Sequence, residues 1–166
     1  MLVGRSNVGK SSLINALTKQ KLARTSADPG KTRLANVYEV GTIHLIDLPG
    51  YGYAKGGSSG FDDLAQAVFA RRPAALLLVD SRHPGLESDR AAWEWMTAAA
   101  DDAAVVATKI DKLVRGERIR AMRQLQSVYD APVVPVSAET GEGMEDLWKL
   151  IASLSKPRPR RKNPNA

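Results

Sequence analysis

Close to its start the chain reads Gly4-Arg5-Ser6-Asn7-Val8-Gly9-Lys10-Ser11, which fits the phosphate-binding pattern G-x-x-x-x-G-K-[ST]. The two glycines let the backbone turn and approach phosphate oxygens, so that main-chain N–H groups point inward. The helix expected from Gly9 adds the positive end of its dipole. In this pattern Lys10 reaches the β- and γ-phosphates of a nucleotide, and the Ser11 hydroxyl binds Mg²⁺. The stretch therefore predicts a nucleotide site where a strand passes into a helix.

A second motif, Asp47-Leu48-Pro49-Gly50, follows the apolar run 43–46. We expect the Asp47 carboxylate to hold Mg²⁺ through water, because that ion keeps several waters in proteins. The Gly50 N–H can bond the γ-phosphate and so report its presence. The motif is weak alone, but its distance from the phosphate loop makes it specific.

Two further motifs predict the base of the nucleotide. In Thr108-Lys109-Ile110-Asp111, the Asp111 carboxylate can accept two hydrogen bonds, from the guanine N1–H and 2-amino group. Adenine offers neither donor, so discrimination on the order of hundreds-fold is expected. The Lys109 stem is expected to lie over the base. Ser137-Ala138 follows another apolar run, and the Ala138 N–H can bond the guanine O6.

Other residues are candidates to act on the γ-phosphate of the nucleotide. Thr32 lies in a loop without apolar periodicity, and can supply a second Mg²⁺ ligand that is released after hydrolysis. Tyr51 stands where Ras-like enzymes carry a glutamine that orients water, so slow hydrolysis is expected. Asn7 is either a structural asparagine or helps to hold a K⁺ ion, as in some related GTPases. Lys10, Thr32 and Asn7 are therefore the candidate catalytic residues.

Short apolar runs alternate with helical patterns along the chain. The expected strands are 36–40, 42–46, 75–79, 105–108 and 133–136, and the expected helices are 9–18, 62–71, 88–100, 116–129 and 144–154. This alternation predicts an α/β fold: a doubly wound P-loop domain with a mostly parallel sheet, helices on both faces, and ligands at the carboxyl ends of the strands. Gly41 predicts a hairpin that makes 36–40 an antiparallel edge strand.

Only Met1, Leu2 and Val3 precede the phosphate loop, so the strand that feeds it can be no more than a stub. Truncation of the amino terminus is the favoured interpretation, and a naturally short central strand is the alternative.

Composition limits the other possibilities. The chain has 166 residues, 43% hydrophobic and 25% charged, which is ordinary for one globular domain. No apolar run approaches the roughly 18 residues that a membrane span needs, and the absence of cysteine excludes disulfides. Five basic residues in 156–162 supply most of the net charge of +6. We expect a cytoplasmic monomer with a G domain over 1–155 and a tail over 156–166, which is either a solvated end or an arm for RNA phosphates.

The residues also resemble a known family, EngB (also called YsxC or YihA), bacterial GTPases of the TrmE–Era–EngA-like class implicated in large ribosomal subunit assembly. The resemblance rests on Gly4–Ser12, Pro29–Thr32, the run Asp47–Lys55, and Asp80–Pro84, which is similar to the family's D-x-R-H-P. It extends from Leu2 to about Leu154. Two departures are the missing segment before the phosphate loop and a shorter, glycine-rich segment after Lys55.

The resemblance implies Mg²⁺ ligation by Ser11 and Thr32, GTP and GDP as ligands, a pre-50S ribosomal particle as partner, and a role in septation. The nucleotide-binding residues that it implies are Gly4–Ser11, Gly30, Lys31, Thr32, Arg33, Leu34, Asp47, Leu48, Pro49, Gly50, Thr108, Lys109, Ile110, Asp111, Val136, Ser137 and Ala138.

Functions from different classes remain open at this point. The first is a GTP-hydrolysing switch that binds a pre-ribosomal particle in its GTP form. The second is a nucleotide-dependent RNA or protein binding module with negligible turnover. A G domain serving tRNA modification or iron transport is the weakest alternative, since flanking domains are lacking.

Overall fold

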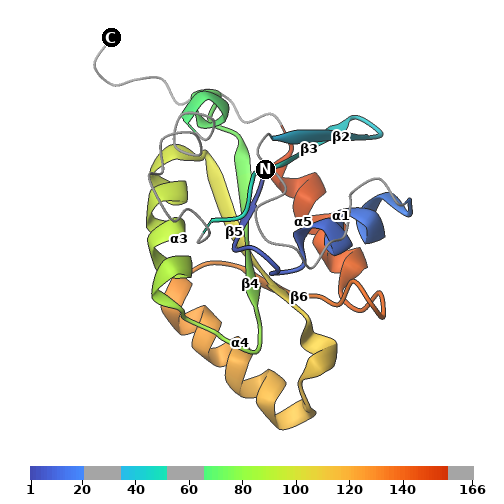
Figure 1. Ribbon diagram of the computed structural model, residues 1–166, viewed down its shortest axis with the longest axis vertical. Helices are drawn as coiled ribbons and strands as arrows, with labels where there is room; N and C mark the ends of the chain where they lie inside the picture. The colour runs from blue at the N-terminus through green and yellow to red at the C-terminus, as the bar shows by residue number, and fades with distance from the viewer. Residues whose placement is uncertain (21–34, 52–65, 157–166) are drawn as a thin grey trace.

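The computed structural model describes residues 1–20, 35–51 and 66–156. Within these residues six strands form one sheet in the order β2-β3-β1-β4-β5-β6 (Figure 1). Strand β2 runs antiparallel to β3 at the edge, and every other pair is parallel. The predicted doubly wound architecture and the antiparallel edge strand are therefore confirmed. The strands are β1 (Leu2–Gly4), β2 (Asn36–Val40), β3 (Ile43–Asp47), β4 (Ala74–Asp80), β5 (Asp102–Thr108) and β6 (Val133–Pro135).

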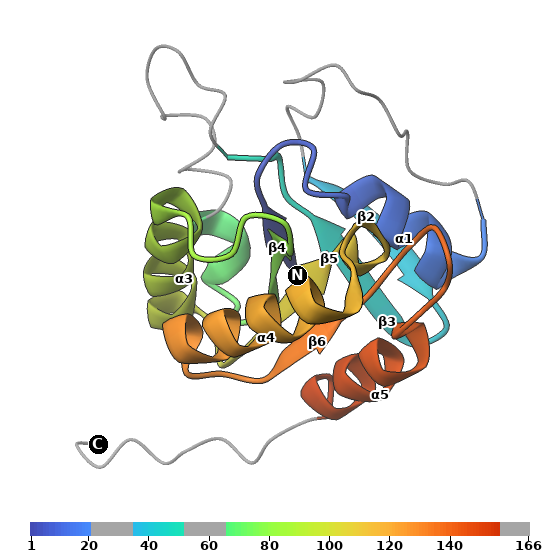
Figure 2. The same cartoon turned by 90° about the horizontal axis from the view of Figure 1, so that it is seen from below.

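Helices cover both faces of this sheet, with α1 and α5 on one face and α3 and α4 on the other (Figure 2). On the first face Leu2 and Leu78 pack with Ile14 of α1 and Leu147 of α5. Alternate strand residues point to the second face, where they pack with α3 and α4. A sheet buried on both faces must be apolar at successive positions, which explains the continuous apolar runs. The helices are α1 (Lys10–Thr18), α3 (Glu87–Ala99), η1 (Ile110–Lys112), α4 (Arg115–Tyr129) and α5 (Met144–Leu154).

The strand that leads into the phosphate loop is short but central. β1 has three buried residues, and Leu2 pairs with Asp47 on one side and Leu76 on the other. The Met1 α-amino group donates to the carbonyl oxygen of Ala74 at 2.7 Å. Its burial lowers its pKa to about 6. The predicted stub is thus a three-residue strand, and truncation stays a prediction.

Most predicted boundaries agree with the structure within one residue, and β5 differs more. It begins at Asp102, three positions before the predicted start, because Asp102 and Ala103 pair in register with Ala74 and Ala75 of β4. The predicted helix 62–71 lies partly outside the described residues, within which 66–69 are helical. Residues 30–34, Thr32 among them, and the tail from 157 onward also lie outside the described residues.

Candidate functional site

The described site residues all lie where parallel strands end. The phosphate loop follows β1, Asp47 closes β3, Thr108 closes β5, and Val136 follows β6. The carboxyl ends of parallel strands meet at one edge of a sheet, which is where doubly wound domains bind ligands. The predicted motifs are therefore brought together, although they span more than a hundred residues of sequence.

The phosphate loop is held in its turn by backbone conformation and close packing. Asn7 and Gly9 have left-handed φ angles of 62° and 104°. A Cβ on Gly4 would lie 2.8 Å from Val8 Cγ1 and 3.1 Å from the carbonyl oxygen of Leu78, so this position has room only for glycine. The Leu13 N–H donates to the Gly9 carbonyl at 2.9 Å and starts α1. The result is a cradle of main-chain amides at a helix N-terminus, suited to phosphate.

Lys10 and Asp47 face each other beside this cradle. Lys10 Nζ lies 3.7 Å from Asp47 Oδ1, and that buried oxygen has no hydrogen-bond partner in the described part of the chain. Burial raises the pKa of Asp47 and lowers the pKa of Lys10, and the pairing of the two charges opposes both shifts. An orphaned buried carboxylate oxygen fits a hard divalent cation, for which this oxygen and the hydroxyl of Ser11, in the first turn of α1, are suitable ligand types. The donor set therefore fits Mg²⁺.

Gly50 packs directly against the phosphate loop. A Cβ added to it would lie 2.7 Å from the Ser6 backbone nitrogen and 2.8 Å from Ser6 Oγ. The Asp47–Gly50 motif and the phosphate loop are thus in contact, which puts the Gly50 backbone beside the phosphate position.

A pocket of about 170 Å³ lies at the other end of the loop, where the guanine base is predicted. The Thr108 hydroxyl donates to the Val8 carbonyl at 2.7 Å and fastens the loop to β5. A hydrogen bond from the Ser137 side chain lowers the pKa of Asp111 and so favours the ionised carboxylate, as the predicted contact with guanine requires. A larger cavity, of about 940 Å³, lies at the amino ends of the strands and contains none of the predicted site residues. The smaller pocket, of about 170 Å³, is lined by Gly9, Ser12, Leu13, Thr108, Lys109, Asp111, Lys112, Val136, Ala138 and Glu139.

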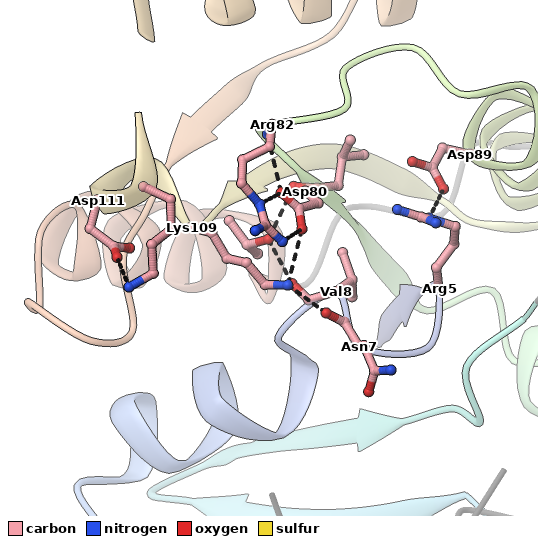
Figure 3. A network of polar contacts seen from close by, with 11 residues as sticks. Arg5, Asn7, Val8, Asp80, Arg82, Asp89, Lys109 and Asp111 are labelled. Carbon is pink, nitrogen blue, oxygen red and sulfur yellow. Dashed lines mark hydrogen bonds and ion pairs between the residues drawn. The ribbon is translucent and has the colours of Figure 1, made fainter. Parts of the chain in front are cut away.

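Asp80 joins the site although no role for it is predicted from the sequence. Lys109 Nζ donates to the Asn7 carbonyl oxygen at 2.6 Å and to Asp80 Oδ2 at 3.0 Å (Figure 3). Arg82 Nε and Nη2 donate to the two oxygens of the same carboxylate at 2.9 and 2.7 Å. Burial opposes ionisation of Asp80, but the hydrogen bonds from Arg82 and Lys109 outweigh it and hold the pKa of this carboxyl well below its usual range. The only sequence signal was the D-x-R-H-P resemblance.

Tyr51 belongs to a second cluster, on the α3 side of the loop. Its hydroxyl donates to Asp89 Oδ1 of α3 at 2.8 Å, and Arg5 Nε lies 3.4 Å from the same oxygen. Asp89 is fully buried and its Oδ2 has no hydrogen-bond partner in the described part of the chain. The Tyr51 side chain is therefore engaged with α3. No motif marked Asp89 in the sequence, because it stands alone in an amphipathic helix.

Comparison with known proteins agrees with this geometry. A family model described as 50S ribosome-binding GTPase matches residues 1–109. The Probable GTP-binding protein EngB of Pelotomaculum thermopropionicum is 43% identical over 162 residues, which cover 90% of this chain and 82% of that protein. The chain belongs to the EngB family of GTPases. The EngB protein of Thermotoga maritima is 41% identical over 165 residues, covering 93% of this chain and 85% of that one.

Solved structures confirm the fold that EngB membership implies. A crystal structure of a probable GTP-binding protein EngB has a TM-score of 0.71 at 24% identity, covering 92% of this chain and 96% of that chain. Era, crystallised with MgGDPNP and a segment of 16S ribosomal RNA, has a TM-score of 0.76 at 25% identity. The match covers 95% of this chain but 57% of Era, so the chain spans little more than half of that protein. As a member of the EngB family, the chain is a GTPase that binds guanine nucleotides. None of the helices within the described ranges has the length and apolar character needed to cross a bilayer.

Proposed function

We propose that the chain is a slowly hydrolysing GTP switch that assists assembly of the large ribosomal subunit and is needed for normal septation. The observation that carries this proposal is the convergence of the four motifs at one sheet edge, with the phosphate cradle and the Asp111 pocket joined through Lys109. The family description as 50S ribosome-binding and the ribosomal RNA bound by Era support the partner. In this proposal the pre-50S particle binds the GTP form.

Each end of the site has a distinct task in this proposal. Main-chain amides of the phosphate loop hold the α- and β-phosphates, and Lys10 reaches the β- and γ-phosphates. Asp111 accepts hydrogen bonds from guanine, with Ala138 N–H on O6 and the Lys109 stem over the ring. Ser11, Thr32 and Asp47 would hold Mg²⁺, which neutralises charge on the phosphates when bound.

The low intrinsic rate follows from Tyr51. A glutamine at this position orients the attacking water in Ras-like enzymes. Here the Tyr51 hydroxyl is committed to Asp89, so the residue offers the water no hydrogen-bonding group. Asn7 is exposed at the rim of the loop, and we propose that its side-chain oxygen helps to bind K⁺ next to the γ-phosphate. A cation there would supply the positive charge that other GTPases obtain from an arginine finger.

Three further expectations accompany the proposal: a G domain over residues 1–155 followed by a basic tail over 156–166, a cytoplasmic location, and a monomeric state. They rest on the composition and charge distribution described above.

Binding measurements test the switch directly. We expect GTP to bind at least a hundredfold more tightly than ATP, because adenine leaves the Asp111 carboxylate unpaired. Sedimentation with large ribosomal subunits should show binding with a non-hydrolysable GTP analogue and weaker binding with GDP. Equal affinity for ATP and GTP would reject the nucleotide assignment, and absence of subunit binding in both nucleotide states would reject the ribosomal role.

The second candidate is a nucleotide-dependent binding module with negligible turnover, which the engagement of Tyr51 with α3 favours. Single-turnover hydrolysis with K⁺ or Na⁺, each with and without large subunits, separates the two. Acceleration by K⁺ or by subunits supports the switch, and an unchanged rate in all four conditions supports the binding module.

A further inference from the structure

Helix α4 presents an arginine-rich face to solvent. Ala121, Leu125 and Tyr129 are buried on its inner side, where the Tyr129 ring contacts the Trp93 ring with 5.6 Å between centroids. The opposite side carries three exposed arginines and lies on the outside of the molecule (Figure 2). We call this surface the α4 face and define it as Arg115, Ile119, Arg120 and Arg123.

The charges of the α4 face have no acidic partner among the residues that the structure describes. Arg115, Arg120 and Arg123 form no ion pair or side-chain hydrogen bond within the described part of the chain. The nearest acid on the helix, Glu117, accepts the Val114 N–H at 3.0 Å and so caps the helix start. Arg118, by contrast, donates to both carboxylate oxygens of Glu142 at 2.9 and 3.0 Å. One arginine of α4, Arg118, therefore has a structural partner, whereas the three arginines of the α4 face have none among the described residues.

The other outer helices have a different charge pattern. The exposed residues of α3 include Glu87 and Glu94, and on α5 Lys149 is paired with Glu145 at 2.8 Å. Two exposed hydrophobic side chains also lie on or near the α4 face. Val114 is 70% exposed just before the helix and Ile119 is 46% exposed within it. Arginine is enriched in binding surfaces, and a group of unpaired exposed arginines beside exposed apolar residues fits such a surface.

We propose that the α4 face binds ribosomal RNA, with Arg115, Arg120 and Arg123 on backbone phosphates and Ile119 against the sugar edges between them. This proposal rests on the ribosomal role proposed above and adds the surface that carries it. The planar guanidinium matches phosphate with two parallel hydrogen bonds. Eight residues of helix separate Arg115 from Arg123 by about 12 Å along the axis, and Arg120 lies between them, so the three charges are spread along the exposed side of the helix, where a phosphate backbone can contact them.

Charge complementarity favours RNA over an acidic protein as the occupant. A protein surface rarely offers a continuous row of anions, whereas a phosphate backbone does. The helix is also rigidly fixed by its buried side and by Gln124, which donates to the Pro84 carbonyl at 3.1 Å. Because α4 carries no predicted contact to the γ-phosphate, its contribution to binding should be the same with GDP and with a GTP analogue.

The test compares two variants of the full chain that lose the same charge. The first is Arg115→Gln/Arg120→Gln/Arg123→Gln, in which glutamine keeps helix propensity. The matched control is Lys19→Gln/Arg71→Gln/Lys149→Gln, which removes three exposed cations from other surfaces. Affinity for purified large subunits and for deproteinised 23S ribosomal RNA is measured over a salt series, with GDP and with a GTP analogue. Nucleotide affinity and circular dichroism check that both variants fold.

We expect the α4 variant to bind RNA and subunits at least about tenfold more weakly at moderate salt. The slope of log affinity against log salt should become shallower by about 2 to 3, because each lost phosphate contact removes a little under one unit of slope. The control should lose far less of both. Equal losses in the two variants, or an unchanged slope in the α4 variant, would overturn the proposal. Loss of subunit binding with intact binding to bare RNA would assign the α4 face to a ribosomal protein and also overturn it. If the unmodified chain binds no subunits in either nucleotide state, the proposed ribosomal function fails instead.

Discussion

Lys109 and Asp80 form an ion pair across two neighbouring strand ends, with 3.0 Å between Nζ and Oδ2, and the same ammonium group donates to the Asn7 carbonyl at 2.6 Å. The lysine thereby connects the predicted base pocket to the phosphate loop. Because Asp80 is itself held by Arg82, the position of Lys109 depends on a residue outside the nucleotide motifs.

Replacement of Asp80 tests this dependence. Asp80→Asn removes the charge that orients Lys109, and charge-assisted hydrogen bonds contribute about 1.5 to 3 kcal/mol. We therefore expect GDP and GTP affinity to fall roughly tenfold or more, measured with a fluorescent nucleotide. Asp101→Asn is the matched control, because Asp101 is also an aspartate paired with an arginine, Arg72, but lies away from the site, and its affinity should stay close to that of the unmodified chain. Unchanged affinity in Asp80→Asn would show that Lys109 needs no such support.

Asp111→Asn should change the base that the site prefers. An amide offers one acceptor and one donor in place of two acceptors, which disfavours guanine and suits xanthine. We expect GTP affinity to fall by a hundredfold or more and xanthosine triphosphate to become the better ligand. Asp130→Asn serves as control, since Asp130 is an exposed aspartate at the end of α4 and does not line the pocket. Retention of GTP preference in Asp111→Asn would contradict the role assigned to this carboxylate.

Tyr51→Phe should separate stability from turnover. The variant leaves the buried Asp89 carboxylate without its hydroxyl donor, and loss of a hydrogen-bond partner costs about 1 to 3 kcal/mol of unfolding free energy. Single-turnover hydrolysis should remain within about twofold of the unmodified rate, a change of less than half a kcal/mol in the barrier, because this hydroxyl faces α3. Chemical denaturation and a hydrolysis time course measure the two effects. A large loss of rate with intact stability would contradict this prediction and give the Tyr51 hydroxyl a role in hydrolysis.

Asp89 should also give the stability of the nucleotide-free protein a pH dependence. Burial raises the pKa of Asp89, against the hydrogen bond from Tyr51 and the charge of Arg5. The folded state therefore binds this proton more readily than the unfolded state, and the contribution of Asp89 to stability rises as the pH falls from neutrality towards about 4. Asp89→Asn should remove that part of the slope, seen as the difference between the two unfolding profiles over this range. If the unmodified chain instead loses stability relative to Asp89→Asn as the pH falls, the pKa of Asp89 is lowered and this prediction is wrong.

Gly50→Ala tests the contact between the second motif and the phosphate loop. The added methyl group would lie 2.7 Å from the Ser6 nitrogen, so the loop or the motif must move. We expect nucleotide affinity to fall about tenfold or more, since a shift of the cradle misaligns its amides. Gly116→Ala is the control, because the nearest atom to its Cβ is the flexible Arg120 Nη1 at 3.6 Å, and nucleotide binding should not change. Normal affinity in Gly50→Ala would show that the loop tolerates the displacement.

Local patterns were sufficient for much of this molecule. The phosphate loop, the Asp47 motif and the 108–111 motif are contiguous, and their chemistry is encoded by residue types a few positions apart. The apolar runs predicted the strands, and the Gly41 turn predicted the antiparallel edge, because sheet burial and turn geometry act over short distances. Boundaries such as the start of β5 were missed, since pairing with β4 extends the strand into residues without strong propensity.

The amino-acid sequence by itself determined the nucleotide motifs, their order and the α/β fold class. Only the tertiary structure decided that Asp80 supports Lys109, that Tyr51 turns to Asp89 and that three arginines of α4 have no ion-pair partner among the described residues. These relationships join residues 29 and 38 positions apart, or depend on which side of a helix is buried. A local pattern records residue type and spacing, whereas such contacts arise when parallel strands bring distant carboxyl ends to one edge and the core selects the inner face of each helix.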